Sequence, residues 1–137
     1  SVATIANAMD VGDPSNFARI LDLYGRSLEA IRADISAARY DDEQICRAIA
    51  ETLERTGYLL DPHGACGYLA LCEGLREDET GVFLETAHPA KFRDRVEPVV
   101  GRSIEIPARL AEFMRGKKLS VELPADFGAF RDFLMAK

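Results

Sequence analysis

The sequence predicts a helix-rich α/β fold with few strands, and three observations lead to it. Most of the 137 residues fall into segments whose apolar side chains recur every three or four positions, the period of an amphipathic helix. One short apolar run, residues 81–86, instead has the composition of a strand. Hydrophobic residues make up 47% of the chain and charged residues 29%, which is ordinary for a globular protein, so we exclude disorder and collagen-like repeats.

Prolines mark the expected starts of most helices. The first helical position has no partner for its N–H, so proline fits there, and an Asp before it can cap the next free amides. Five of the six prolines stand where a helix is expected to begin, and the first two of them follow an Asp: Pro14, Pro62, Pro89, Pro107 and Pro124. Pro98 is instead expected to help end the helix that begins at Pro89, before Gly101.

Apolar periodicity places the helices in chain order. We expect them from about residue 14 to 24, then over 27–38, 41–56 and 62–75, then from 89 to about 100, from 107, and from 124 onward. Gly57 is the expected stop of the third helix. In the last helix Phe127, Phe130 and Leu134 form one apolar stripe.

Strand signals are fewer. Residues 81–86 are the best candidate, residues 1–6 a second and residues 118–123 a weak third. One or two isolated strands cannot form a stable sheet. We therefore expect the partner strands to come from elsewhere, which makes this chain part of a larger α/β domain.

Composition also limits the partners. A net charge of -6 argues against nucleic acid, and the longest apolar stretches are far too short to span a bilayer. Three cysteines without CxxC spacing favour reduced, buried thiols, and no signal peptide is visible, so we expect a cytoplasmic protein. No GxGxxG or Walker motif is present.

Two helix starts carry candidate site residues. Thr86 and His88 lie between the predicted strand and the helix at Pro89, where open α/β sheets bind ligands. The alternative is that Thr86 ends the strand and His88 caps the helix. His63 follows Asp61 at another helix start, either as a ligand or acid/base group or simply in the first turn behind an Asp cap.

Two kinds of chemistry are disfavoured. Cys66 is flanked by Ala65 and Gly67 on a helix expected to be buried, which suits a packed thiol better than a nucleophile paired with His63. No His or Cys pair has the close spacing of zinc ligands, so we expect no metal site.

Five short motifs occur in a characteristic order. They are Asn-Ala-Met-Asp at 7–10, Pro-Ser-Asn-Phe at 14–17, Leu-Asp-Pro-His at 60–63, Thr-Ala-His-Pro-Ala-Lys-Phe at 86–92 and Leu-Pro-Ala-Asp-Phe at 123–127. This series closely resembles the C-terminal part of threonine synthase, a pyridoxal-phosphate (PLP) enzyme of the tryptophan-synthase-β fold type, fold type II. The resemblance covers essentially the whole chain.

The resemblance implies an activity and a cofactor. The family converts O-phosphohomoserine and water into L-threonine and phosphate, the last step of threonine biosynthesis, with PLP held by a Schiff-base lysine. That lysine and the glycine-rich phosphate loop precede the matched segment. None of the lysines here fits the motif: Lys91, Lys117, Lys118 and Lys137. Residues 1–137 are therefore expected to be a C-terminal fragment of the large PLP-binding domain that is not active alone.

The resemblance also assigns site residues. Thr86 corresponds to the threonine beside the pyridine nitrogen of the cofactor, and His88 to a wall of the same pocket. The blocks at 7–10 and 61–63 are expected to help build the domain around the cleft. The remainder of the same enzyme is the expected partner, and apolar surface that it normally covers is expected to let the fragment self-associate.

Two alternatives remain open at this stage. The chain could belong to another fold-type II PLP lyase, against which the motifs at 60–63 and 86–92 argue. It could also be a non-catalytic helical interaction module derived from such an enzyme, which would suit its many helices and few strands.

Overall fold

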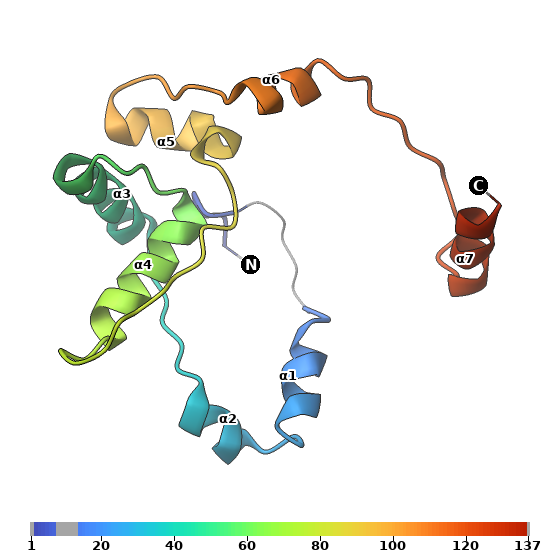
Figure 1. The fold of residues 1–137 in the computed structure, drawn as a ribbon, viewed down its shortest axis with the longest axis horizontal. Coiled ribbons are helices and arrows are strands. Elements are labelled where there is room, and N and C mark those ends of the chain that lie inside the picture. The colour runs from blue at the N-terminus through green and yellow to red at the C-terminus, as the bar shows by residue number, and fades with distance from the viewer. Residues whose placement is uncertain (1, 8–13, 137) are drawn as a thin grey trace. The chain divides into compact units, whose positions relative to one another are not determined.

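The computed structural model describes residues 2–7 and 14–136 (Figure 1). The chain divides into two compact units, Ser1–Glu105 and Ile106–Lys137. Most of the block at 7–10 lies outside the described residues, and so does Asp13. The first unit contains the candidate residues at 61–63 and 86–88.

Helices are the regular structure of both units. In the first unit they are α1 (Phe17–Leu23), α2 (Leu28–Asp34), α3 (Asp42–Thr56), α4 (Pro62–Gly74), the 3-10 helix η1 (Pro89–Phe92) and α5 (Arg93–Val100). The second unit contains α6 (Ala108–Met114) and α7 (Phe127–Met135). The helix-rich prediction is thus confirmed, and none of the described helices has the length and apolarity to cross a bilayer.

The third helix follows its local signals closely. The Asp41 side chain accepts a hydrogen bond from the Gln44 N–H at 2.9 Å, and the Gln44 side chain accepts one from the Asp41 N–H at 3.0 Å. This reciprocal capping box satisfies two amides that would otherwise lack partners at the helix start. At the other end Gly57 adopts the left-handed conformation with φ 74°, so its role as the stop of α3 is confirmed.

Proline starts two helices as predicted. Pro62 lies in the first turn of α4 behind the capping side chain of Asp61, and Pro89 begins η1 behind His88. The helix that follows η1 ends at Gly101, with φ 65°, and Pro98 lies inside its last part.

Three helix ends differ from the prediction. Pro124 does not begin α7, because Asp126 caps Ala129 at 2.7 Å and the helix starts at Phe127. The first helix begins at Phe17, after a turn that follows Pro14. The second helix ends at Asp34 instead of residue 38, because Ile35 is extended, with φ -120° and ψ 120°.

The core lies where α3 packs against α4 and α5. Its buried apolar side chains come from these helices, from η1 and from the adjoining loops: Ile45, Ala48, Ile49, Leu60, Ala65, Phe92, Val96 and Ile104. The N-terminal segment joins it, because the Ile5 N–H donates to Asp42 Oδ1 at 3.1 Å. This core supports the start of α4 and the start of η1, which carry the candidate site residues.

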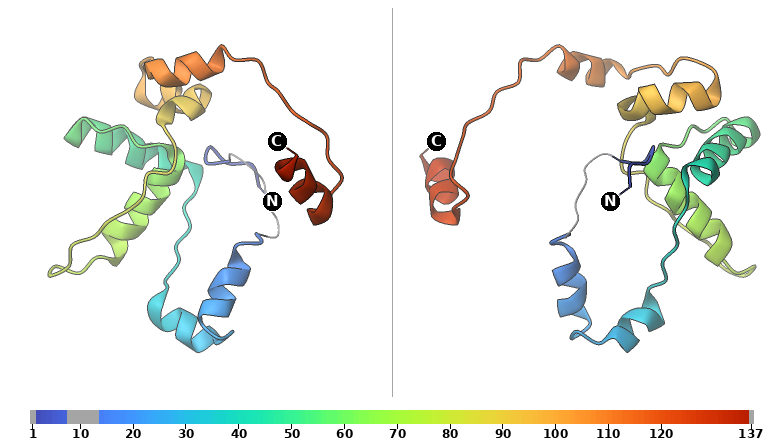
Figure 2. Two further views of the ribbon diagram at one scale, coloured as in Figure 1. Left: turned by 45° about the vertical axis from the view of Figure 1, so that its right-hand side comes forward. Right: turned by 180° about the vertical axis from the view of Figure 1, so that it is seen from behind.

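The strand predictions are wrong for the described part of the chain, which contains no strand. Residues 81–88 are extended and run back along α4, as Figures 1 and 2 show. A strand needs a ladder partner, and residues 81–88 have none among the described residues. Residues 5–6 form a turn, and residues 118–123 likewise lie outside any ladder.

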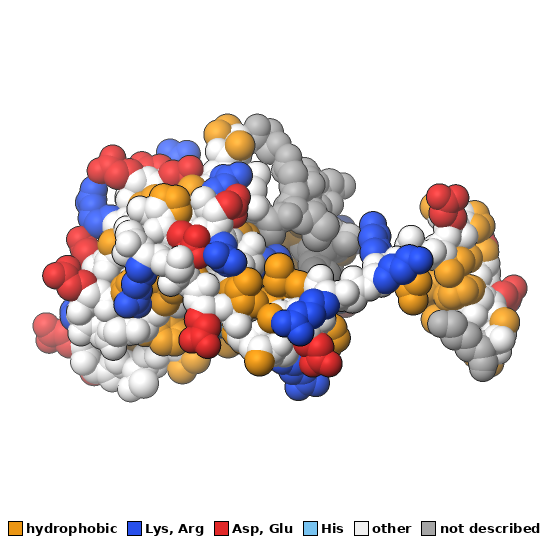
Figure 3. Space-filling model, turned by 90° about the horizontal axis from the view of Figure 1, so that it is seen from above, with side chains coloured by type: hydrophobic (Ala, Val, Ile, Leu, Met, Phe, Trp, Pro, Cys, Tyr) orange, Lys and Arg blue, Asp and Glu red, His pale blue; other side chains and the backbone are white. Residues whose placement is uncertain are grey.

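Apolar side chains remain on the surface of both units (Figure 3). The predicted stripe of α7 is among them, with Phe127 at 79%, Phe130 at 49% and Leu134 at 52% exposure. An amphipathic helix normally buries such a stripe. The stripe therefore marks a surface that this unit does not cover by itself.

Substitution of Ile49 tests the core. Ile49 is fully buried, so Ile49→Ala should lower the free energy of unfolding of the chain by about 2–5 kcal/mol, through lost apolar contact and the cavity left behind. Urea unfolding followed by circular dichroism measures this. The matched control Leu23→Ala removes a side chain that is 79% exposed and should change the value by less than about 0.5 kcal/mol. Equal effects of the two substitutions would contradict this core.

Candidate functional site

The extended segment presents two different faces. Phe83, Glu85 and Ala87 are half-buried, whereas the residues between them, Leu84 and Thr86, are exposed. Alternation of this kind follows from extended backbone, in which successive side chains point to opposite sides. The ring of Phe83 contacts Tyr68 of α4 at 5.7 Å between centroids, so the inner face packs on α4.

The backbone of this segment is free to pair. From residue 80 to residue 87, no N–H or C=O group of the main chain bonds to another described residue. The outer face is also apolar at Val82 and Leu84, which are 82% and 77% exposed. An extended stretch with open hydrogen-bonding groups and exposed apolar side chains is a ready edge for strand addition.

Thr86 lies on the outer face, and its hydroxyl has no partner among the described residues. His88 lies on the same face, two positions further on. Its Nδ1 accepts a hydrogen bond from the Ala90 N–H at 3.1 Å, which confirms that His88 caps the helix. Because Nδ1 is the acceptor, a neutral His88 carries its proton on Nε2, which can donate to a ligand. The two side chains can thus offer donors on one side.

Asp61 organises the start of α4. It is fully buried, and its Oδ1 accepts from the His63 N–H at 2.9 Å and lies 3.1 Å from His63 Nδ1. The imidazole also contacts the ring of Phe92, with 5.2 Å between centroids. This confirms the interpretation of Asp61 as a cap with His63 in the first turn.

Glu85 is the site residue that the sequence reasoning missed. Its Oε2 accepts a hydrogen bond from the Asp61 N–H at 3.5 Å. Burial, then the hydrogen bond to the Asp61 side chain, then the charge of Asp61 raise the pKa of Glu85 to about 7. Its inward place in the alternating pattern was the available signal, because a charged side chain on the packed face of an extended segment needs a partner.

Lys91 and Cys66, the lysine and the cysteine nearest to the site, both make packing contacts that do not suit a catalytic role. Lys91 Nζ lies 5.6 Å from the centroid of the Phe92 ring, a cation–π contact. Burial, then the charge of Asp61, raise the pKa of Cys66, so its reactive thiolate form is scarce at neutral pH. Within the described residues Cys66 and His63 share no hydrogen bond, so a Cys66–His63 nucleophile is disfavoured.

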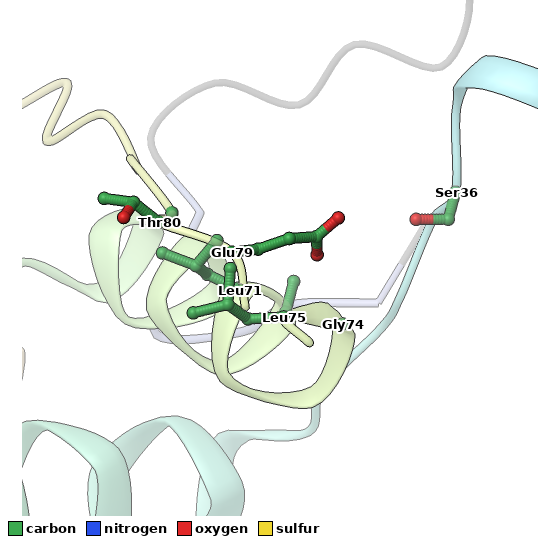
Figure 4. A pocket seen from close by; sticks show the side chains of 8 residues that line it. Ser36, Leu71, Gly74, Leu75, Glu79 and Thr80 are labelled. Carbon is green, nitrogen blue, oxygen red and sulfur yellow. The ribbon is translucent and has the colours of Figure 1, made fainter. Parts of the chain in front are cut away.

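No metal centre is evident within residues 2–7 and 14–136, where no three His, Cys, Asp or Glu side chains gather as a metal would need. A pocket of about 440 Å³ opens at the end of α4. Figure 4 shows Leu71 from α4, Leu75 just after the helix, Glu79 and Thr80 from the following loop, and Ser36 across from them. None of the predicted site residues lines it, so it is separate from the face that carries Thr86.

Several known proteins are similar to this chain in sequence. A family model described as threonine synthase, C-terminal, matches residues 64–134. The threonine synthase of Escherichia coli K12 is 41% identical over 133 residues, which cover 97% of this chain and 31% of that protein. The threonine synthase of Serratia marcescens is 42% identical over 135 residues, which cover 98% of this chain and 31% of the relative.

Solved structures agree. The crystal structure of threonine synthase from Escherichia coli has a TM-score of 0.73 at 41% identity and covers 98% of this chain and 31% of that one. The PLP-bound threonine synthase from Brucella melitensis has a TM-score of 0.74 at 29% identity and covers 98% and 34%.

These matches define the class as a helix-rich C-terminal domain of the threonine synthase type. The chain belongs to the threonine synthase family, and the resemblance predicted from the motifs is confirmed. It spans 31% of the length of the Escherichia coli and Serratia marcescens relatives.

Thiol labelling tests the surroundings of Cys66. All three cysteines are free, and Cys72 is exposed, contrary to the prediction that all are buried. Burial followed by the charge of Asp42 raises the pKa of Cys46, as burial and Asp61 raise that of Cys66. A chromogenic disulfide reagent at pH 7.5 should therefore modify Cys72 first and the other two several-fold more slowly. In Cys72→Ser the fast phase should vanish; a Cys66 that reacts first would contradict these surroundings.

Proposed function

We propose that this chain is the C-terminal part of a threonine synthase that uses PLP to convert O-phosphohomoserine and water into L-threonine and phosphate. The observation that carries the proposal is 41% identity to the Escherichia coli enzyme along 97% of the chain. In this proposal the activity belongs to the intact enzyme, which acts in the cytoplasm, and not to residues 1–137 alone.

The proposal places both units in the large PLP-binding domain of a fold-type II enzyme. Support comes from the segment at 80–87, whose main chain bonds to no described residue although one of its faces packs on α4. A sheet supplied by the remainder of the enzyme would pair with these groups and cover Val82 and Leu84. The apolar stripe of α7 would be covered in the same way, and without the remainder such surfaces lead copies of the chain to self-associate.

Thr86 is the proposed cofactor-binding residue. When bound, PLP supplies an electron-accepting ring that lets protons leave substrate carbon atoms. An exposed threonine without a partner fits the edge of such a ring, because its hydroxyl can donate to the pyridine nitrogen. A neutral hydroxyl also favours the protonated ring nitrogen far less than a carboxylate would. His88, on the same side, would form a wall of the pocket.

The remainder of the enzyme would supply the lysine that binds PLP covalently. Lys91, the lysine nearest to the site in sequence, interacts with the Phe92 ring at the start of η1 and is suited to packing there. This chain would therefore contribute hydrogen bonding and shape to the cofactor pocket and leave the covalent attachment to the preceding polypeptide.

Substitution of Thr86 in the intact protein tests the function. The intact protein should release phosphate from O-phosphohomoserine and show the absorbance band of bound PLP, whereas residues 1–137 alone should do neither. Thr86→Ala should shift that band and lower kcat by about 10-fold or more, because one hydrogen bond is worth about 1–1.5 kcal/mol or more in a desolvated site. Thr86→Ser keeps the hydroxyl and should retain both. Turnover by residues 1–137 alone, or an unchanged band in Thr86→Ala, would contradict the assignment.

Hydrogen exchange tests the proposed pairing of the extended segment. In residues 1–137 alone, the amides of residues 81–87 should exchange within seconds, because none of them is hydrogen-bonded to the described chain. In the intact protein the same amides should be protected by at least 100-fold, while those in α3 are protected in both. Equal exchange of 81–87 in the two proteins would favour a helical module that needs no sheet.

A further inference from the structure

We propose that Asp61 and Glu85 hold one proton between their carboxyl groups, and that this shared proton fastens the extended segment to α4 and so positions Thr86. The positioning role rests on the proposed function of Thr86. The shared proton rests only on the structure of this chain.

Each of the two carboxyl groups has one oxygen with a partner and one without. Asp61 Oδ1 accepts from the His63 N–H, and Glu85 Oε2 accepts from the Asp61 N–H. Asp61 Oδ2 and Glu85 Oε1 are both buried and have no partner within the described chain. Two carboxylates would leave both oxygens unsatisfied and would repel each other, whereas one proton between them satisfies both.

The groups that face the pair do not remove the need for this proton. His63 is the basic side chain paired with it, and it contacts Asp61 Oδ1, not the unpartnered Oδ2, at 3.1 Å. Tyr58 and Cys66 face it as neutral groups. The pKa of Tyr58 is raised by burial and then by the charges of Glu85 and Asp61, and that of Cys66 by burial and then by Asp61. The proton therefore resides on Glu85, whose pKa of about 7 agrees with this placement.

Gly64 makes the approach of Glu85 possible. A Cβ atom at position 64 would lie 1.6 Å from Glu85 Oε1 and 2.4 Å from its carboxyl carbon. The Glu85 carboxyl group thus occupies the space that the Cβ atom of any non-glycine residue at position 64 would fill. Gly67, one turn further on, would place a Cβ 3.8 Å from Phe83, an ordinary contact.

The link from Glu85 to Thr86 is the alternation of the extended segment. Because neighbouring side chains point to opposite sides, holding Glu85 against the start of α4 directs the Thr86 hydroxyl to the open face. Asp61 and Glu85 are thus positioning residues. They act on Thr86 through the backbone of the extended segment.

The first test is titration of Glu85 in residues 1–137 by carbon-13 NMR of its carboxyl group. We expect a midpoint near 7 in the wild type and in Gly67→Ala, and a midpoint near the ordinary 4.5 in Gly64→Ala, where the new methyl group displaces the carboxyl. Both alanine variants gain the same helix propensity, so they form a matched pair. A wild-type midpoint near 4.5 would overturn the shared proton.

The pH dependence of the free energy of unfolding provides a second test of the shared proton. The folded chain keeps the Glu85 proton up to about pH 7, whereas the unfolded chain loses it near 4.5, so the wild type becomes less stable as pH rises between these values. Glu85→Gln keeps a neutral donor for Asp61 and cannot titrate. The unfolding constant of the wild type relative to Glu85→Gln should therefore rise by up to about tenfold per pH unit from 4.5 to 7. A ratio that is flat across this range would overturn the proposal.

The positioning role is tested in the intact protein by the absorbance band of bound PLP at pH 7. Gly64→Ala should shift the band in the same direction as Thr86→Ala, whereas Gly67→Ala and the conservative Glu85→Gln should leave it in place. If Thr86→Ala shifts the band and Gly64→Ala does not, the positioning role is refuted. If neither variant shifts the band, the proposed function of Thr86 is refuted. The shared proton is then tested by the titration of Glu85 alone.

Discussion

The buried side chain of Asp61 is the interaction on which the arrangement of the first unit depends. One oxygen caps α4 and holds the His63 ring, and the main-chain N–H of the same residue reaches Glu85. Two segments that are separate in sequence therefore meet at one residue: the start of α4 with the loop before it, and the extended segment at 81–88. The helix core beneath it is apolar and would not by itself select the direction of this segment, because apolar contacts are not directional.

The two faces of the extended segment have different roles. Its inner face is fully engaged, through Phe83 on Tyr68 and Glu85 at the start of α4. The outer face and the main chain stay available. A piece of a larger α/β domain needs this division, since the inner face must hold its own helices while the edge receives strands from elsewhere.

The parts of the fold that could be predicted from the sequence are those set by neighbouring residues. The third helix was predicted to within a residue, because the capping side chain of Asp41 and the stop at Gly57 act within one turn of the helix ends. The start at Pro62 was predicted for the same reason. The start of α7 was not, because Pro124 and Asp126 both favour a helix start and only the cap on Ala129 decides between them.

The site was predicted in part. The position before the helix at Pro89 pointed to Thr86 and His88, which are both exposed, whereas the predicted strand has no ladder partner among the described residues. Glu85 escaped prediction because its partner, Asp61, is 24 residues away and the contact forms only when the segment folds back on α4. Gly64 carries a consequence for how such chains vary: a methyl group at position 64 displaces the Glu85 carboxyl from the start of α4, so glycine at 64 and a long acidic side chain at 85 depend on each other. We expect these two positions to change together or not at all as the family diverges.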